Sequence, residues 1–204
     1  MKHDETLLDE LIAVGADAAR RGLVLASAGN FSVRLSDDTF AITGSGVWFD
    51  RLSRADFATM NLTGEHLRGV TPSSEWRLHR EVYKRRPDVK CVLHLHPEYA
   101  TLLPTLGHKI RLLTLDHAFY AGEIGVTEFY PNGSDALAET AAAELETKNC
   151  VIMKHHGCSV VADTVEMAYR RALNLEGAAR MSFNALQLQD SETVFPDGAA
   201  AHHA

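Results

Sequence analysis

The chain has 204 residues, of which 46% are apolar, so it is long enough to bury one hydrophobic core without disulfides to brace it. Its 20 Lys and Arg residues face 27 Asp and Glu residues, and the net charge of −7 argues against a nucleic-acid or membrane-surface protein. A phosphorylated small molecule is not excluded, because a few local donors suffice to bind it. No apolar run reaches the ~20 residues of a membrane span. Three widely spaced cysteines predict free thiols and a cytoplasmic location.

Helical and strand-like patterns alternate along the chain, which predicts the α/β class. We expect a single domain over residues 1–186 and a surface tail over 187–204. The predicted helices cover residues 5–20, 75–85, 98–106, 134–146 and 164–186, with a short additional helix capped by Ser53. The predicted strands are a hairpin over 30–43, followed by 90–96, 126–130, 150–153 and 159–161.

Two histidines lie at the end of an apolar strand. His94 and His96 share one face of that strand because side chains alternate along it, so their imidazoles can converge on one metal ion. Two polar residues on a half-exposed strand are the simpler alternative. His155-His156-Gly157 follows another apolar strand and offers a third ligand, but the residues alone leave open which of the two histidines points inward. Three imidazoles and no thiolate leave a coordination position free, which is typical of catalytic metal sites.

Residues 73–75 form the predicted start of a helix, where unpaired N–H groups and a partial positive charge favour a phosphate. Glu75 in the first turn is a candidate general base, or it simply complements the helix dipole. Glycine-containing turns at 28–30 and 43–46 can bring backbone N–H groups to the same anion, although neither matches a nucleotide-binding fingerprint. His79, one turn after Glu75, is expected to be a partly exposed helix histidine.

Five motifs, taken in chain order, resemble the class II aldolase/adducin family; each is weak alone, and together they are specific. They are Ala28-Gly29-Asn30, Thr43-Gly44, Pro72 to His79, His94-Leu95-His96-Pro97 and His155-His156-Gly157. The likeness extends from the first predicted helix to the last. It is greatest to the L-fuculose-1-phosphate aldolases, chiefly through residues 72–77 and 155–157.

The resemblance implies a three-layer α/β/α fold with a central, mostly antiparallel sheet, assembled as a homotetramer with active sites between subunits. It implies Zn²⁺, with Mn²⁺ as the alternative, held by His94, His96 and His156, and it thereby selects His156 over His155. Glu75 becomes the acid/base and a metal ligand in the resting state. The residues assigned to the substrate phosphate are Gly29, Asn30, Thr43, Gly44, Ser73 and Ser74.

The activity implied by the resemblance is cleavage of a ketose 1-phosphate, such as L-fuculose 1-phosphate, to dihydroxyacetone phosphate and an aldehyde through a metal-stabilised enediolate. The same scaffold serves 3-oxo-tetronate 4-phosphate decarboxylases and sugar-phosphate 4-epimerases and dehydratases, which are the alternatives. A non-catalytic, adducin-like interaction protein is a further alternative, although the histidines and the glutamate that such relatives lose are all present here.

The segment 115–122 departs from the family's pattern. The fuculose-phosphate aldolases use a tyrosine of the neighbouring subunit in this segment as the acid on the aldehyde half, whereas this chain has Asp116 at that place. Tyr120 and His117 are the other candidates for the role.

Overall fold

The computed structural model describes residues 2–196 of the chain. Its strands are β1 (Asn30–Arg34), β2 (Thr39–Thr43), β3 (Phe57–Asn61), β4 (His66–Gly69), β5 (Cys91–Leu95), β6 (Ile124–Thr127), β7 (Cys150–Met153) and β8 (Gly157–Ala162). Its helices are α1 (Lys2–Arg20), α2 (Trp76–Arg85), α3 (Glu98–Thr105), α4 (Asp135–Glu144) and α5 (Val165–Gln187), with short turns η1 (Phe49–Arg51), η2 (Arg54–Asp56) and η3 (His117–Ala121). The strands form one open sheet in the order β4-β3-β2-β1-β5-β8-β7-β6, which is antiparallel except between β6 and β7.

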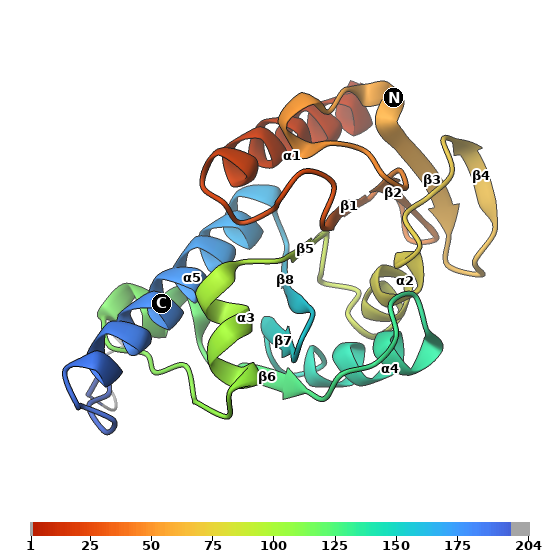
Figure 1. Cartoon of the computed structure of the whole chain (residues 1–204). Coiled ribbons are helices and arrows are strands. Elements are labelled where there is room, and N and C mark those ends of the chain that lie inside the picture. Colours follow the sequence, from red (N-terminus) through yellow and green to blue (C-terminus); the bar gives the residue numbers. More distant parts are fainter. Residues whose placement is uncertain (1, 197–204) are drawn as a thin grey trace.

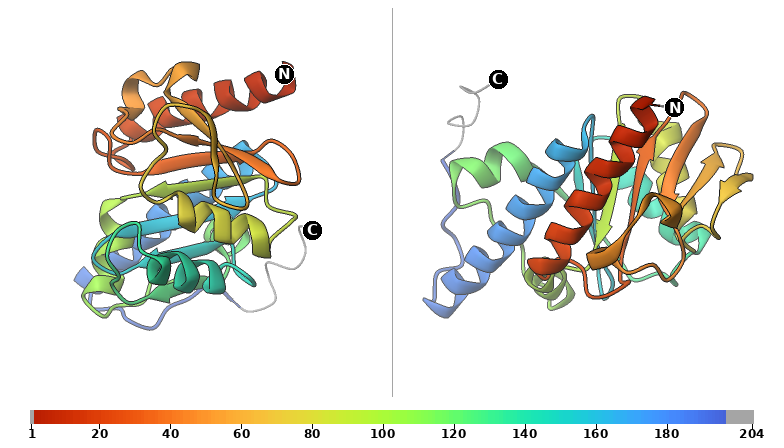
Figure 2. Two further views of the ribbon diagram at one scale, coloured as in Figure 1. Left: turned by 90° about the vertical axis from the view of Figure 1, so that its right-hand side faces the viewer. Right: turned by 90° about the horizontal axis from the view of Figure 1, so that it is seen from above.

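Helices cover both faces of this sheet, so the predicted three-layer α/β/α architecture is confirmed (Figure 1 and Figure 2). α1, α3 and α5 pack on one face, and α2 and α4 pack on the other. The alternation of side chains along β1 shows how the layers are built: Phe31 and Val33 join the core on the α1 and α5 side. Ser32 and Arg34 point the other way and bond to α2.

Side-chain caps fix the starts of α4 and α5. The Ser134 hydroxyl accepts a hydrogen bond from the Leu137 amide at 3.1 Å, and the Thr164 hydroxyl accepts one from Met167 at 3.1 Å. Each cap satisfies an N–H group that the first turn of a helix leaves without a partner. α4 and α5 therefore begin within a residue of their predicted starts.

The sheet is wider than the sequence predicts, because β3 and β4 were not expected. The short helix predicted after Ser53 is only the turn η2, in which the Asp56 carboxylate accepts bonds from the Ser53 amide at 2.8 Å and hydroxyl at 2.7 Å. The chain then pairs with β2 from Phe57 onward, and Phe57 is buried in the core rather than placed on a helix.

The strand predicted over 126–130 is wrong in its position. β6 spans 124–127 because its parallel pairing with β7 begins at Ile124 opposite Cys150 and ends at Thr127 opposite Met153. Because β7 ends at Met153, residues 128–130 of the predicted strand have no partner strand.

The first part of the predicted tail lies against the segment before η3. The buried Arg111 side chain donates hydrogen bonds to the carbonyl oxygens of Asp190 at 2.8 Å and Thr193 at 2.9 Å, and the Phe195 amide donates to Leu112 at 2.7 Å. Residues 197–204 of the predicted tail lie outside the described residues, and the division at residue 186 stays a prediction.

Two further sequence expectations concern thiols and membrane spans. Cys91, Cys150 and Cys158 are free and buried, as predicted. Within residues 2–196, none of the helices combines the length and the apolar character that crossing a bilayer would require.

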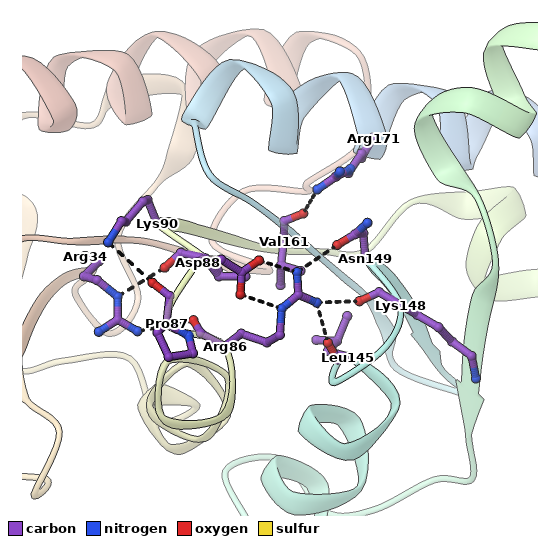
Figure 3. Close-up of polar contacts among 11 residues, drawn as sticks. Arg34, Arg86, Pro87, Asp88, Lys90, Leu145, Lys148, Asn149, Val161 and Arg171 are labelled. Atoms are coloured by element: carbon purple, nitrogen blue, oxygen red, sulfur yellow. Dashed lines mark hydrogen bonds and ion pairs between the residues drawn. The ribbon is translucent and has the colours of Figure 1, made fainter. Parts of the chain in front are cut away.

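The carboxyl end of α2 is held by a dense set of polar contacts (Figure 3). The guanidinium of Arg86 donates to both carboxylate oxygens of Asp88, at 2.8 and 2.7 Å. It also reaches the carbonyl oxygens of Leu145 and Lys148, just beyond the end of α4, and thereby joins two helices that pack on the same face. Arg34, at the end of β1, donates to the carbonyl oxygen of Tyr83 in α2.

Candidate metal centre and active site

Three imidazoles converge at the opposite end of β1 and β5. The rings of His94, His96 and His156 lie with centroids 4.8 to 5.0 Å apart, and one nitrogen of each lies within 4.8 Å of the other two. His94 and His96 come from the carboxyl end of β5, and His156 comes from the turn between β7 and β8. Pairing of β5 with β8 brings these two segments together, because Leu95 lies opposite Cys158.

The hydrogen bonds of His94 orient it as a metal ligand. Its Nδ1 lies 2.9 Å from the carbonyl oxygen of Cys158, which can only accept, so Nδ1 carries the proton. The other nitrogen, Nε2, then faces the interior of the cluster, 2.9 Å from Nε2 of His96. The strand β8 therefore sets the tautomer that leaves a lone pair for a cation.

Glu75 completes the cluster from the amino end of α2. Its Oε2 lies 3.1 Å from Nε2 of His94, its Oε1 lies 3.4 Å from Nε2 of His156, and Oε2 accepts a hydrogen bond from the Asn30 amide at 2.8 Å. Burial opposes ionisation of Glu75, but the neighbouring histidines, His94 foremost, and the Asn30 amide outweigh it and lower the pKa of the carboxyl below its usual range. Glu75 is therefore a buried carboxylate.

The donor set fits a divalent metal ion. Burial, with His94 nearby, lowers the pKa of His96 to about 3 and that of His156 to about 4, so both rings are neutral at pH 7 and have lone pairs to offer. Oε1 of Glu75 and Nδ1 of His156 are buried without a hydrogen-bond partner. Facing lone pairs and a carboxylate repel one another unless a cation lies between them, and three imidazoles with a carboxylate suit zinc and similar ions.

The structure distinguishes between the two neighbouring histidines. His156 is turned into the cluster, whereas His155 has a positive φ of 61°, its amide donates to the Thr105 hydroxyl at 2.9 Å, and its exposed ring lies against Phe129. A Cβ on Gly157 would collide with the Leu95 carbonyl oxygen and lie 2.6 Å from a ring carbon of His96. The glycine therefore lets the turn bearing His156 approach β5 closely.

The residues predicted for a phosphate lie in three adjoining segments. The Ser73 amide donates to the Thr43 carbonyl at 3.1 Å, and Gly44 forms a bridge with Pro72. Gly29, with a φ of 133°, lies so close to β5 that a Cβ would be 2.7 Å from the His94 carbonyl oxygen. Ser74 is exposed beside these segments.

Two of the predicted phosphate residues have internal hydrogen bonds. The Thr43 hydroxyl accepts from the Phe31 amide at 3.1 Å, and the Asn30 side chain is bonded to Glu75. The set as a whole stays a prediction.

The candidates for the aldehyde-side acid lie on the turn η3, which packs against α5. Tyr120 accepts a hydrogen bond from Arg170 of α5 at 3.2 Å, His117 is buried, and Asp116 is exposed just before the turn. Tyr120 contacts α5, and the His117 amide donates to Thr114 in the loop before η3. The part of these residues in a site between subunits stays a prediction.

One functional neighbour of the cluster was misjudged from the sequence. His79 is completely buried rather than partly exposed, and both of its ring nitrogens are hydrogen bonded, to Ser32 and to Asn30, each at 2.6 Å. Two signals point to this arrangement: Asn30 and Ser32 alternate on one face of β1, and His79 follows Glu75 by one helical turn.

A cavity of about 400 Å³ opens beside the cluster. It is lined by His96 and His156 together with the first turns of α3, including Pro97, Glu98 and Thr101. Two of the three imidazoles, those of His96 and His156, therefore border an open cavity.

Comparison with known proteins agrees with this geometry. The model of the family described as the class II aldolase and adducin N-terminal domain matches residues 9–183. The chain belongs to this family. Its resemblance to the family, predicted from five motifs, is thereby confirmed.

Relatives with different activities are about equally similar to the chain. The 5-methylthioribulose-1-phosphate/5-deoxyribulose-1-phosphate aldolase of Rhodospirillum rubrum is 32% identical over 186 residues, 89% of this chain and 84% of the relative. The 3-oxo-tetronate 4-phosphate decarboxylase of Haemophilus influenzae is 29% identical over 178 residues, 85% of each chain. The solved structure of an L-fuculose 1-phosphate aldolase superposes with a TM-score of 0.88 at 28% identity, over 96% of this chain and 93% of the other.

Proposed function

We propose that this protein is a divalent-metal-dependent aldolase that cleaves a ketose 1-phosphate, such as L-fuculose 1-phosphate, to dihydroxyacetone phosphate and an aldehyde. The observation that carries the proposal is the convergence of three imidazole nitrogens on the buried carboxylate of Glu75. Membership of the class II aldolase and adducin family supports it. A divalent ion, Zn²⁺ by the choice of ligands, is held by His94, His96 and His156.

When bound, the ion supplies Lewis-acid stabilisation of the negative charge that develops on substrate oxygens. Glu75 moves the proton. In cleavage, the aldehyde-side residue accepts the proton of the substrate hydroxyl whose carbon becomes the aldehyde, the carbon–carbon bond breaks, and its electron pair stays with the phosphate-bearing fragment. Glu75, once it has taken up a proton from solvent, donates it to that carbon. In the reverse direction the Glu75 carboxylate removes the same proton.

The three segments around Gly29, Thr43 and Ser73 bind the substrate phosphate in this proposal. Remote contacts of this kind fix the orientation of the reacting carbons. Tyr120 or Asp116 of a neighbouring subunit acts on the aldehyde half in this proposal. The assembly we propose is a homotetramer with sites shared between subunits. Three free cysteines support a cytoplasmic location for it.

A substrate panel tests the proposal. Zinc-loaded protein is incubated with ketose 1-phosphates and with 3-oxo sugar-acid phosphates, while triose phosphate and carbon dioxide are measured separately. We expect triose phosphate from a ketose 1-phosphate, complete loss of this activity after chelation, and recovery when zinc is restored. Carbon dioxide from an oxo-acid phosphate, without triose phosphate from any ketose, would instead support the decarboxylase. Full activity after metal removal would contradict both.

A further inference from the structure

A continuous chain of buried side chains runs behind Glu75, between α2 and β1. The Tyr83 hydroxyl lies 2.7 Å from the Ser32 hydroxyl, which lies 2.6 Å from Nδ1 of His79. Nε2 of His79 lies 2.6 Å from the Asn30 side-chain oxygen, and the Asn30 amide nitrogen donates to Glu75 at 2.8 Å. The proposed function uses Glu75 and the segment that contains Asn30, and it leaves His79, Ser32 and Tyr83 without a role.

The two hydrogen bonds of the Asn30 side chain set the direction of every bond in the chain. Its amide nitrogen donates to Glu75, and its oxygen faces Nε2 of His79. That oxygen only accepts, so Nε2 of His79 carries a proton and Nδ1 is left with a lone pair.

The same logic continues to the far end. Ser32 donates to Nδ1 of His79 and therefore accepts from the Tyr83 hydroxyl. One tautomer of His79 and one orientation of the Asn30 amide satisfy all of these bonds, and the opposite orientation of Asn30 would set two acceptors against each other.

Burial makes this arrangement stringent. Each of the five members is buried, and Ser32 and His79 are completely so. An unpaired polar group in such a place costs far more than one that can turn to water. The far end is fixed as well, because the ring of Tyr83 stacks on the Arg34 guanidinium at 4.8 Å. The chain therefore transmits a fixed orientation from the core to the carboxylate.

We propose that His79 is a positioning residue: as a neutral imidazole protonated on Nε2, it fixes the Asn30 amide and thereby the orientation of the Glu75 carboxylate. The proposal rests on the proposed function, in which Glu75 transfers the proton. His79 itself does not touch the three imidazoles that bind the metal in that proposal, so it acts on turnover and leaves metal binding intact.

Two conservative variants separate positioning from packing. In His79→Gln the side-chain amide reaches the place of Nε2 and can donate to Asn30, whereas in the shorter His79→Asn it reaches only the place of Nδ1. In zinc-loaded protein with L-fuculose 1-phosphate, we expect His79→Asn to lower kcat about tenfold with KM and bound zinc unchanged. His79→Gln should keep most of the turnover. Equal turnover in His79→Asn and wild type, equal impairment of both variants, or loss of zinc in step with activity would overturn the proposal.

A measurement independent of activity tests the tautomer directly. In wild-type holoenzyme with ¹⁵N-labelled histidine, the ring signals that are absent from His79→Gln should be those of a neutral imidazole with its proton on Nε2. A proton on Nδ1, or a doubly protonated ring, would overturn the proposal even if His79→Asn failed to fold.

Glu75→Gln keeps the two proposals distinguishable. If Glu75→Gln turns over L-fuculose 1-phosphate as fast as wild type, the proposed function fails. If Glu75→Gln is inactive while His79→Asn is fully active, only the positioning role of His79 fails.

Discussion

The charged side chains at the two ends of α2 differ in how completely they are hydrogen bonded. At the carboxyl end, the Arg86 guanidinium donates five hydrogen bonds to its neighbours (Figure 3). Arg34 beside it donates four. At the amino end, Glu75 is buried with one oxygen that has no hydrogen-bond partner, and His156 has a buried nitrogen in the same condition. Both ends lie on the same helix and face the same strand, β1.

Under the proposed function, the difference separates charged groups that stabilise the fold from a charged group that takes part in the reaction. An ion withdrawn from water contributes to stability only when its hydrogen-bonding capacity is satisfied, as that of the half-buried Arg86 is. Atoms left without partners cost stability, and they persist where a ligand completes them. Changes at the amino end should therefore alter activity more than stability, and changes at the carboxyl end should do the reverse.

The largest effect is expected from Glu75→Gln in the zinc-loaded protein. Because the amide cannot transfer a proton, kcat should fall about 10³-fold, while bound zinc and the unfolding midpoint stay close to those of wild type. Kinetics, metal analysis and thermal unfolding of the same preparation check this. A variant that kept its turnover, or that unfolded far more easily, would erase the contrast between the two ends.

Arg86→Met is the matching change at the carboxyl end. It removes the bonds to Asp88 and to the carbonyl oxygens of Leu145 and Lys148, so the free energy of unfolding should fall by about 3 kcal/mol. Urea denaturation measures the loss, and kcat per folded molecule should equal that of wild type. A fall in kcat per folded molecule would show that this end of α2 also serves catalysis.

The pH dependence of stability tests the buried histidine between the two ends. Burial lowers the pKa of His79 to about 3, so between that value and the ordinary pKa near ~6.5 the unfolded chain binds a proton that the folded protein does not. Stability therefore falls as the pH falls through this window. From pH 6.5 to pH 5, His79 should account for about 2 kcal/mol of that fall.

His79→Gln supplies the control, since glutamine does not titrate. Urea unfolding in the presence of a chelator, at both pH values, should show a smaller loss of stability in the variant than in wild type. The same loss in both proteins would mean that His79 binds its proton in the folded state as well.

The smallest effect is expected from Asp88→Asn. Asp88 is exposed, and exposed ion pairs contribute little even when their geometry is good, so the free energy of unfolding should fall by about 0.5 kcal/mol. Urea denaturation of Asp88→Asn and Arg86→Met side by side compares their free energies of unfolding. A loss as large as that of Arg86→Met would assign the stabilisation to the ion pair rather than to the carbonyl contacts.

Much of this fold was predictable from the sequence, and what was missed has a physical pattern. The helices and the central strands β1, β5, β7 and β8 have apolar periodicities that burial imposes on them. β4 was missed because all four of its residues are exposed, so that no apolar face marks it. β3 was missed because the capping residues before it suggested a helix that ends after one turn.

The site was predictable as a set of residues, and less so as a set of contacts. Strand alternation alone places His94 and His96 on one face, and the family resemblance makes them candidate ligands. The choice of His156 over His155 depends on a turn in which His155 has a positive φ. The residues around position 155 do not predict that turn. His79 was misjudged because its burial depends on how α2 lies along β1, which is a tertiary feature.

Gly157 carries a consequence for how this family can diverge. A methyl group there would press on the backbone of β5 and on the ring of His96, one residue away from the imidazole of His156. Even the smallest side chain at position 157 would thus displace the ring of His96 or the end of β5 that bears it. Among descendants of this chain, loss of that glycine should accompany loss of the metal, and its presence should mark those that still require one.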